Sequence, residues 1–225
     1  MLNPETFFDL SKTKHKSIFD GVELVWDAIK KIHDYIIENL EPKIKGEIMP
    51  GAWVDKNVFI DEGTVVELGA MIKGPAIIGK NCQIRNGAYI RGDIIAGDNT
   101  VLGNSCEFKN VLLFNGANIP HLSYVGDSII GFKSHLGAGA KIANTKLIRE
   151  TIKVKINDKI YDTGLLKFGV ILGDTSDIGC NAVINPGSII GKNCVIYANV
   201  AWRGYLPAER IVKLKQSQNI VERKM

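Results

Sequence analysis

The sequence contains no long uninterrupted hydrophobic run, although 45% of its 225 residues are hydrophobic. A membrane-spanning helix needs about 20 consecutive apolar residues, so we expect no membrane span. The first residues, Met-Leu-Asn-Pro-Glu-Thr, include no basic stretch followed by an apolar one, which argues against a signal peptide. We therefore predict a cytoplasmic protein.

Cysteine and histidine are also scarce, with 4 of each in the chain. The cysteines lack the paired spacing of a zinc site, so we expect them to be reduced core residues and expect no bound metal. The net charge of +4 is too small to indicate a nucleic-acid partner, because basic and aromatic residues do not interleave. It is compatible with an anionic small molecule. The cysteines are Cys82, Cys106, Cys180 and Cys194.

The main regularity of the sequence is a period of six residues. Every sixth residue from Val54 to Phe108 is apolar, and the residue two places before each is mostly small. The step shortens to five at Leu113 and Ile130, and the six-residue step returns after an interruption and continues to Trp202. Such a period indicates a stack of repeats that bury their apolar positions against one another.

Three segments lie outside the repeats. In residues 22–40 the apolar positions recur at three- and four-residue steps, which predicts an amphipathic helix. We expect residues 1–48 to form a helical cap over the first repeat. Residues 143–169 interrupt the array, and apolar residues alternating with lysines around Asn157-Asp158 predict an inserted β-hairpin loop. Residues 203–225 are expected to form a short helical tail.

Glycine follows many of the apolar repeat positions, as in Ile78-Gly79, Leu102-Gly103 and Leu136-Gly137. In this respect the chain resembles the hexapeptide-repeat acyltransferases. The resemblance implies an all-β fold, a left-handed parallel β-helix with three repeats in each coil. It also implies about seven coils over residues 49–202 and assembly into a homotrimer.

Residues 18 apart lie one above another in such a helix, which places Lys73, Arg91 and Lys109 on one face. Like charges at a coil spacing of about 4.8 Å repel each other, and a bound anion would relieve the conflict. Arginine offers a planar fork and lysine a point charge, and both suit phosphate. The alternative is a solvated basic stripe, which we prefer for Lys73 alone.

The segment from Arg91 to Asp127 narrows the resemblance, because it contains Glu107-Phe108-Lys109 and the run His121-Leu122-Ser123-Tyr124-Val125-Gly126-Asp127. It resembles the acetyltransferase domain of the bifunctional N-acetylglucosamine-1-phosphate uridyltransferase/glucosamine-1-phosphate acetyltransferase family. The similarity covers roughly residues 50–200. By this resemblance His121 is the catalytic base, and the substrate-binding residues are Arg91, Lys109, Tyr124, Asn144 and Lys167. Ala138, Cys180 and Ala198 would line the groove for acetyl-CoA between subunits.

Some features depart from the family pattern. The residues ahead of the repeats are too few for a nucleotidyltransferase domain of typical size, so we expect no uridyl transfer. The interruption separates Asn144 from Lys167 more than is usual, as in archaeal sugar-phosphate nucleotidyltransferases that carry the same acyltransferase domain. His135 replaces an asparagine of the sugar site and Thr145 a tyrosine, so the acceptor sugar could differ.

Acetyl transfer from a thioester to an amine needs a base that accepts the amine proton, and a histidine with a pKa near 6.5 suits this task. We therefore predict acetyl-CoA-dependent N-acetylation of glucosamine 1-phosphate, without a metal or a covalent intermediate. The alternatives are another amino sugar, a nucleotide-linked acceptor, or a non-catalytic sugar-phosphate-binding scaffold. Arg91-Gly92-Asp93 also resembles the gamma-class carbonic anhydrases. Those need three zinc-binding histidines, whereas only His121 and His135 lie in the repeats.

Overall fold

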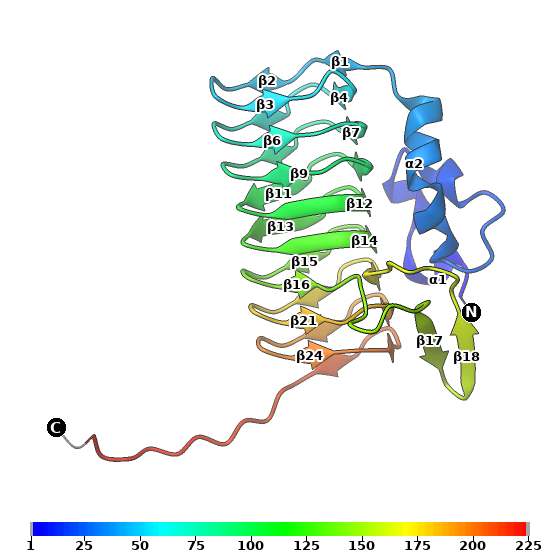
Figure 1. Cartoon of the computed structure of the whole chain (residues 1–225), viewed down its shortest axis with the longest axis vertical. Coiled ribbons are helices and arrows are strands. Elements are labelled where there is room, and N and C mark those ends of the chain that lie inside the picture. The colour runs from blue at the N-terminus through cyan, green and yellow to red at the C-terminus, as the bar shows by residue number, and fades with distance from the viewer. Residues whose placement is uncertain (1, 224–225) are drawn as a thin grey trace.

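Short parallel strands separated by tight corners stack into a β-helix in the computed structural model, which describes residues 2–223 (Figure 1). The coils have three faces, which we name the β1, β2 and β3 faces after their first strands. The predicted hexapeptide-repeat β-helix is confirmed.

The β2 face is a nine-stranded sheet. It consists of β2 (Glu47–Ile48), β5 (Val65–Val66), β8 (Gln83–Ile84), β11 (Val101–Asn104), β13 (Asn118–His121), β15 (His135–Leu136), β20 (Asp177–Ile178), β23 (Val195–Ile196) and β26 (Ile211–Val212). The β3 face consists of β3 (Trp53–Val54), β6 (Met71–Ile72), β9 (Tyr89–Ile90), the first halves of β12 (Glu107–Leu113) and β14 (Tyr124–Ile130), then β16 (Lys141–Ile142), β21 (Val183–Ile184) and β24 (Ala201–Trp202). The β1 face consists of β1 (Lys43–Ile44), β4 (Val58–Ile60), β7 (Ala76–Ile78), β10 (Ile94–Ala96), the second halves of β12 and β14, then β19 (Val170–Leu172), β22 (Ser188–Ile190) and β25 (Tyr205–Leu206).

The register between coils follows the repeat in the sequence. Ile90 pairs with Phe108, which is the predicted step of 18 residues. Phe108 pairs with Val125, one residue fewer, because the five-residue steps shorten this coil. The apolar repeat positions point inward and are buried, and they form one core along the axis of the β-helix. Cys82, Cys106 and Cys194 lie in this core, whereas Cys180 is exposed.

The repeat continues past both of its predicted ends. The nine strands of the β2 face correspond to about nine coils instead of the predicted seven, because β1 and β2 precede residue 49, and β25 and β26 follow residue 202. The prediction of a helical tail was wrong. Ile190 pairs with Leu206, only 16 residues later, so the six-residue template misses this last, shortened coil. Residues 213–223 have no regular secondary structure and run away from the β-helix (Figure 1).

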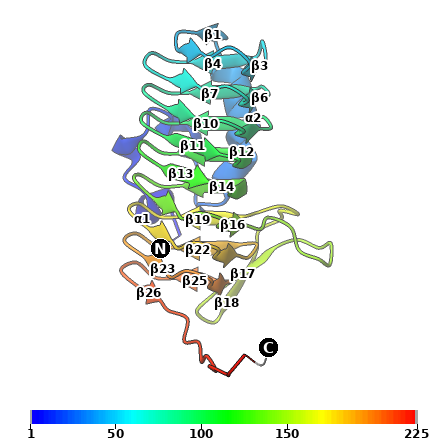
Figure 2. The ribbon, with the colours of Figure 1, turned by 90° about the vertical axis from the view of Figure 1, so that its left-hand side faces the viewer.

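The helices lie along the β1 face (Figures 1 and 2). They are α1 (Pro4–Phe7), the 3-10 helices η1 (Leu10–Lys12) and η2 (Lys16–Phe19), and α2 (Asp27–Asn39), which packs on β10, β12 and β14. We expected this segment over the first repeat, but it covers the side of the stack. The reason is an apolar stripe on the outside of the β1 face, formed by Ile77, Ile95, Leu112 and Ile129, which packs in one cluster with the apolar residues of the N-terminal segment. Among residues 2–223 no helix is long and apolar enough to cross a membrane.

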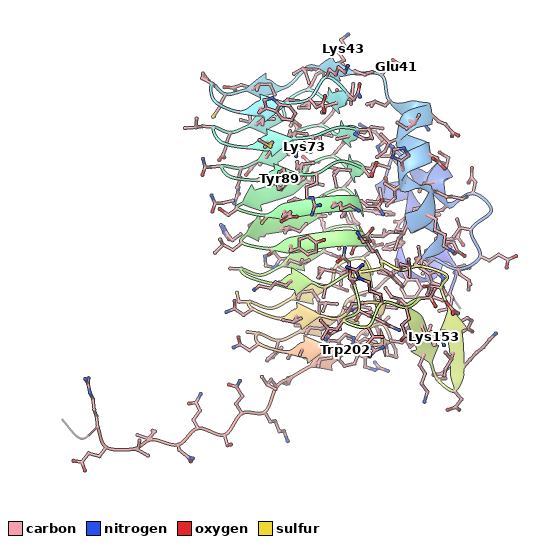
Figure 3. All side chains as sticks on the ribbon, viewed as in Figure 1. Glu41, Lys43, Lys73, Tyr89, Lys153 and Trp202 are labelled. Atoms are coloured by element: carbon pink, nitrogen blue, oxygen red, sulfur yellow. The ribbon has the colours of Figure 1, made fainter. Side chains whose placement is uncertain are left out.

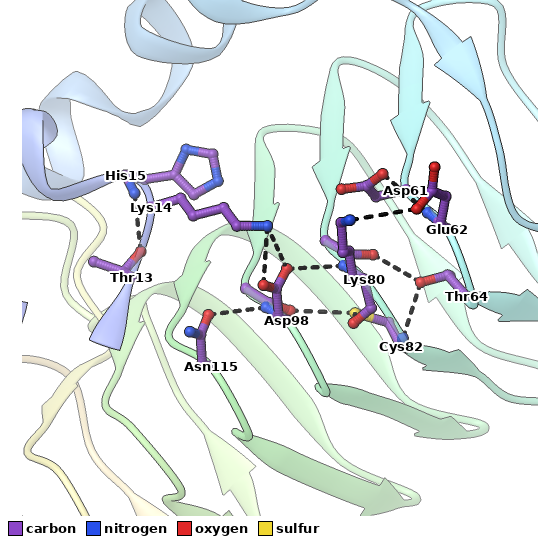
Figure 4. Close-up of polar contacts among 12 residues, drawn as sticks. Thr13, Lys14, His15, Asp61, Glu62, Thr64, Lys80, Cys82, Asp98 and Asn115 are labelled. Atoms are coloured by element: carbon purple, nitrogen blue, oxygen red, sulfur yellow. Dashed lines mark hydrogen bonds and ion pairs between the residues drawn. The ribbon is translucent and has the colours of Figure 1, made fainter. Parts of the chain in front are cut away.

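Polar contacts fix the N-terminal segment to the β-helix. Lys14 Nζ lies 2.9 Å from the carboxylate of Asp98, next to His15 (Figure 4). Further along, the buried carboxylate of Asp174 accepts hydrogen bonds from the backbone amides of Asp9 and Phe132, at 2.6 and 2.7 Å. Backbone donors and a buried acceptor therefore hold this segment in one place.

The insertion forms the predicted hairpin, in which β17 (Lys153–Ile156) pairs antiparallel with β18 (Lys159–Asp162). The hairpin packs against the N-terminal segment, where the rings of Trp26 and Tyr161 are 5.8 Å apart. The backbone amide of Phe168 donates to the carbonyl of Asn144 at 2.9 Å. The chain therefore leaves and re-enters the β-helix at the same corner.

Candidate active site

His121 ends β13 and stands at the corner between the β2 and β3 faces. Leu122 turns this corner in the left-handed region, with a φ of 53°. The His121 carbonyl accepts a hydrogen bond from Ser123 Oγ at 2.9 Å and one from the Gly139 amide of the next coil at 3.2 Å. These bonds fix the backbone while the imidazole is exposed, so the ring is accessible to a substrate.

Small side chains continue this corner through the following coils. The register places Ala138, Cys180 and Ala198 at equivalent positions, each two residues after a paired apolar position. A methyl group on Gly137 would meet the Cys180 amide at 2.7 Å, and one on Gly179 would overlap the Ala198 amide. Glycine is needed before each corner because the next backbone passes so close. His121 and the three predicted coenzyme residues therefore form one column.

The two predicted phosphate-binding residues lie on the β3 face, one coil apart. Arg91 Nη1 donates to Glu107 Oε1 at 2.6 Å, and this bond raises the pKa of the Arg91 guanidinium. Lys109 Nζ lies 3.9 Å from Oδ1 of Asp127. Each basic side chain thus has a carboxylate neighbour, so the expected repulsion between them is reduced before any anion binds.

Lys73 belongs to the same column but has a different environment. Its Nζ donates to the hydroxyl of Tyr89 at 2.8 Å and lies 5.1 Å from the centre of that ring, and the two side chains lie together on the β3 face (Figure 3). A lysine that lies over the ring of a half-buried tyrosine is stabilised without a ligand. This environment agrees with our preference for a solvated residue at Lys73.

Tyr124 and Asn144 are joined to a buried carboxylate. The Asn144 amide donates to the Tyr124 hydroxyl at 3.0 Å and also to Asp127. Asp127, whose side chain is 6% exposed, accepts a further bond from Asn110 at 2.9 Å. Burial, and then the charge of Asp127, raise the pKa of Tyr124, so its hydroxyl stays protonated at neutral pH.

Asp127 and Glu107 were not among the predicted site residues, although each is bonded to a predicted substrate residue. A signal for Asp127 was present in the sequence. Asn110, Asp127 and Asn144 are spaced by 17 residues, which is the length of the shortened coils. That spacing predicts a polar stack at one corner.

A cavity of about 340 Å³ lies between α2 and the corner where the β3 face meets the β1 face. Lys109 and Lys167 line it, together with Asp127, whereas Arg91, His121, Tyr124 and Asn144 do not. Lys167 is exposed and lies near the end of the insertion, whose closure at Phe168 places it near Asn144. The structure therefore places four of the predicted substrate residues, Arg91, Lys109, Tyr124 and Asn144, along the β3 face, and the column of His121 at one corner of that face. Lys167 lies at the other corner.

Comparison with known proteins gives matches over the same repeats. The family model described as "GMPPB C-terminal domain" matches residues 72–165. The protein named "Bifunctional protein GlmU" of Methanococcus vannielii is 36% identical over 174 residues, which are 77% of this chain and 42% of that protein. The protein of the same name from Methanocaldococcus jannaschii is 37% identical over 186 residues, which are 83% and 45% of the two chains.

The predicted resemblance is confirmed. This chain is similar to GlmU through its repeats, but it spans less than half the length of these relatives. A "bifunctional sugar-1-phosphate nucleotidylyltransferase/acetyltransferase" of Sulfurisphaera tokodaii is 33% identical over 155 residues, which are 69% of this chain and 36% of that protein. Among solved structures, UDP-N-acetylglucosamine acyltransferase from Campylobacter jejuni aligns with a TM-score of 0.38 and 15% identity, over 72% of this chain and 69% of that one.

Candidate metal ligands do not cluster in the part of the chain that the structure describes. Within 2–223, no group of three or more His, Cys, Asp or Glu side chains is arranged to hold a metal ion. His135 Nδ1 lies 3.8 Å from Asp177 Oδ1, on the β2 face. Tyr124 and Asn144, which we predicted to bind the sugar, lie on or beside the β3 face, so His135 is separate from them.

Proposed function

We propose that this chain transfers an acetyl group from acetyl-CoA to the amine of an amino-sugar phosphate, and that the acceptor is glucosamine 1-phosphate. One arrangement carries the proposal. A column that contains an accessible histidine and small, exposed or half-buried side chains borders a face that carries Arg91, Lys109, Tyr124 and Asn144. The similarity to bifunctional sugar-1-phosphate acetyltransferases supports it.

In the proposed reaction the phosphate of the acceptor binds Arg91 and Lys109, which exchange their carboxylate neighbours for phosphate oxygens. The sugar then lies along the β3 face against Tyr124, with its amine toward His121. Small residues such as Ala138 and Ala198 leave room for the pantetheine chain of acetyl-CoA beside the histidine.

His121 accepts a proton from the amine while the nitrogen attacks the thioester carbonyl. The carbon–nitrogen bond forms, the carbon–sulfur bond breaks, and coenzyme A leaves as the thiolate, which takes up a proton. The products are an N-acetylated sugar phosphate and free coenzyme A. Cys180 forms no bond in this sequence of steps.

The test follows free thiol release with acetyl-CoA and a panel of amino-sugar phosphates. We expect glucosamine 1-phosphate to support turnover, and His121→Ala to lower turnover by about 10²–10⁴-fold, the usual contribution of a general base. Affinity for coenzyme A should be kept. Asn86→Ala is a matched control, because Asn86 occupies the same column two coils away and should leave turnover unchanged.

Each other outcome selects a different function. Thiol release with a nucleotide-linked amino sugar alone would identify that acceptor class. Binding of sugar phosphate without thiol release from any acceptor would favour the non-catalytic scaffold. An active His121→Ala variant would leave the enzyme class in place and remove His121 as the base.

A further inference from the structure

The cavity beside Lys109 has a second wall, which is not part of the β-helix. Ile29, Lys30 and His33 of α2 line this wall. Lys109 and Lys167, two of the predicted substrate-binding residues, line the other side. An anion held by these two lysines would therefore lie within a cavity that α2 helps to enclose.

His33 is fixed at the edge of this cavity by a contact with the β-helix. Its Nδ1 lies 2.6 Å from Oδ1 of Asp93, which comes directly after Arg91-Gly92. The bond to Asp93 raises the pKa of the His33 imidazole and so favours its cationic form. With Nδ1 bonded to Asp93, Nε2 is the nitrogen left to donate to a ligand.

Lys30 is held more loosely. Its Nζ lies 2.7 Å from Oδ1 of Asp27, one turn earlier on the same helix, and the lysine side chain is 44% exposed. Exposed ion pairs of this kind contribute little to stability. Lys30 can therefore exchange Asp27 for a phosphate oxygen at small cost.

The charges around the cavity favour an anion. Its lining contains four basic side chains and two carboxylates. The two carboxylates have partners already, because Asp93 is bonded to His33 and Asp127 to two asparagine amides. The basic side chains on both walls of the cavity therefore remain available as hydrogen-bond donors to a ligand.

We propose that Lys30 and His33 of α2 bind the phosphate end of the acceptor. They would contact it across the cavity from Lys109 and Lys167, so that the N-terminal segment forms part of the acceptor site. The inference rests on the proposed function, because that function places the phosphate of the acceptor beside Lys109. The ligand class is a sugar phosphate, either a monoester or the diphosphate of a nucleotide-linked sugar.

The experiment measures binding without turnover. Isothermal titration calorimetry of the full chain, without acetyl-CoA, compares glucosamine 1-phosphate with UDP-glucosamine. We expect Lys30→Met and His33→Gln each to weaken binding by about tenfold, the loss of one charge-assisted contact. Lys31→Met is the matched control, because Lys31 donates to the Asp20 carbonyl at 2.6 Å outside the cavity; its affinity should stay within about twofold of the wild type.

Kinetics separate binding from a merely structural role. The two α2 variants should raise KM for the acceptor and leave kcat at saturation unchanged, whereas a disturbed fold would lower kcat and the unfolding temperature as well. A larger effect with UDP-glucosamine would identify a diphosphate as the ligand, and an equal effect with both would identify the phosphate nearest the sugar.

Two results would overturn the inference. In the first, both α2 variants bind the acceptor with wild-type affinity while Arg91→Ala still weakens binding. This result would leave the proposed function intact. The other is a wild-type chain that binds neither compound. If the α2 variants weaken binding but no acceptor supports acetyl transfer, the inference stands and the proposed function fails.

Discussion

The guanidinium of Arg91 and the carboxylate of Glu107 form an ion pair of 2.6 Å between neighbouring coils, with both side chains about two-fifths exposed. An exposed pair of this kind stabilises a protein by about 0–1 kcal/mol. Glu107 thus orients Arg91 without holding it strongly. The pair can open when a phosphate group offers a better match for the guanidinium fork.

Replacing Arg91 by alanine should therefore affect binding and leave folding nearly unchanged. We expect KM for glucosamine 1-phosphate to rise by about 10- to 100-fold, the range for a lost charge-assisted contact, with a nearly constant unfolding temperature. Steady-state kinetics and thermal unfolding provide the two measurements. Arg85→Ala is the control, because Arg85 bonds only to the neighbouring Gln83 side chain among the contacts described. Equal kinetics in both variants would return Arg91 to the solvated-stripe interpretation.

Gly126 offers a way to displace two of the predicted substrate-binding residues, Tyr124 and Asn144, without removing either. A methyl group there would meet the Tyr124 hydroxyl at 2.5 Å and the Asn144 amide at 2.7 Å. We expect Gly126→Ala to push these side chains apart and to raise KM about fivefold, the loss of one hydrogen bond. Tyr124→Phe should have a similar effect. The double variant should be no worse than the larger single effect, whereas fully additive losses would show that Gly126 acts elsewhere.

The environment of His15 should make the free energy of unfolding depend on pH. Burial, assisted by the charge of Lys14, lowers the pKa of His15 to about 4, against 6.5 for the free side chain. The unfolded chain therefore binds a proton more readily than the folded chain between these values. Stability should be unaffected above pH 6.5 and should fall as the pH drops toward 4, by at most about 3 kcal/mol from this residue.

Urea unfolding at pH 7.5 and pH 5 would measure this effect. Carboxylates also respond to acid, so the comparison is with His15→Gln, which cannot titrate. The difference in stability between the two proteins should shrink at pH 5. A constant difference would show that His15 is protonated equally in the folded and unfolded states.

We also predict a homotrimer, a feature implied by the family resemblance. Sedimentation at working concentrations should give about three times the chain mass of 24.7 kDa. Mixing His121→Ala and Arg91→Ala chains before assembly tests whether subunits share a site, with the assay at an acceptor concentration well below the raised KM of the Arg91→Ala variant. Recovered activity would support a shared site, and a monomer would exclude it.

The sequence predicted the core well because a six-residue apolar period leaves little freedom. Ile60, Ile72 and Ile90 must all point inward once the coils stack, and all three are fully buried. The columns of His121 and of Arg91 follow from the same register. The coil count was too low because the coils at both ends are shortened. Ile44 pairs with Ile60 and Ile190 with Leu206, each only 16 residues apart, and both pairings break the template.

The position of α2 along the β1 face was not predicted, although the sequence contained a signal for it. Apolar residues on the β1 face occupy outward positions as well as inward ones, for example Ile77 and Ile95, which indicates a face buried on both sides. The partners of Arg91 and Lys109 could not be predicted in the same way. Glu107 and Asp127 reach them through side-chain conformations, and a periodic pattern does not specify these.

The single hydrogen bond from the Phe168 amide to the Asn144 carbonyl gives the chain a modular junction. The segment between these two residues can change in length without changing the register of the coils. Lengthening a closed loop is inexpensive, because doubling it costs only about 0.6 kcal/mol. The tip of the hairpin between Ile156 and Lys159 can therefore diversify, or accept a foreign peptide, while Asn144 and Phe168 keep their positions at the junction.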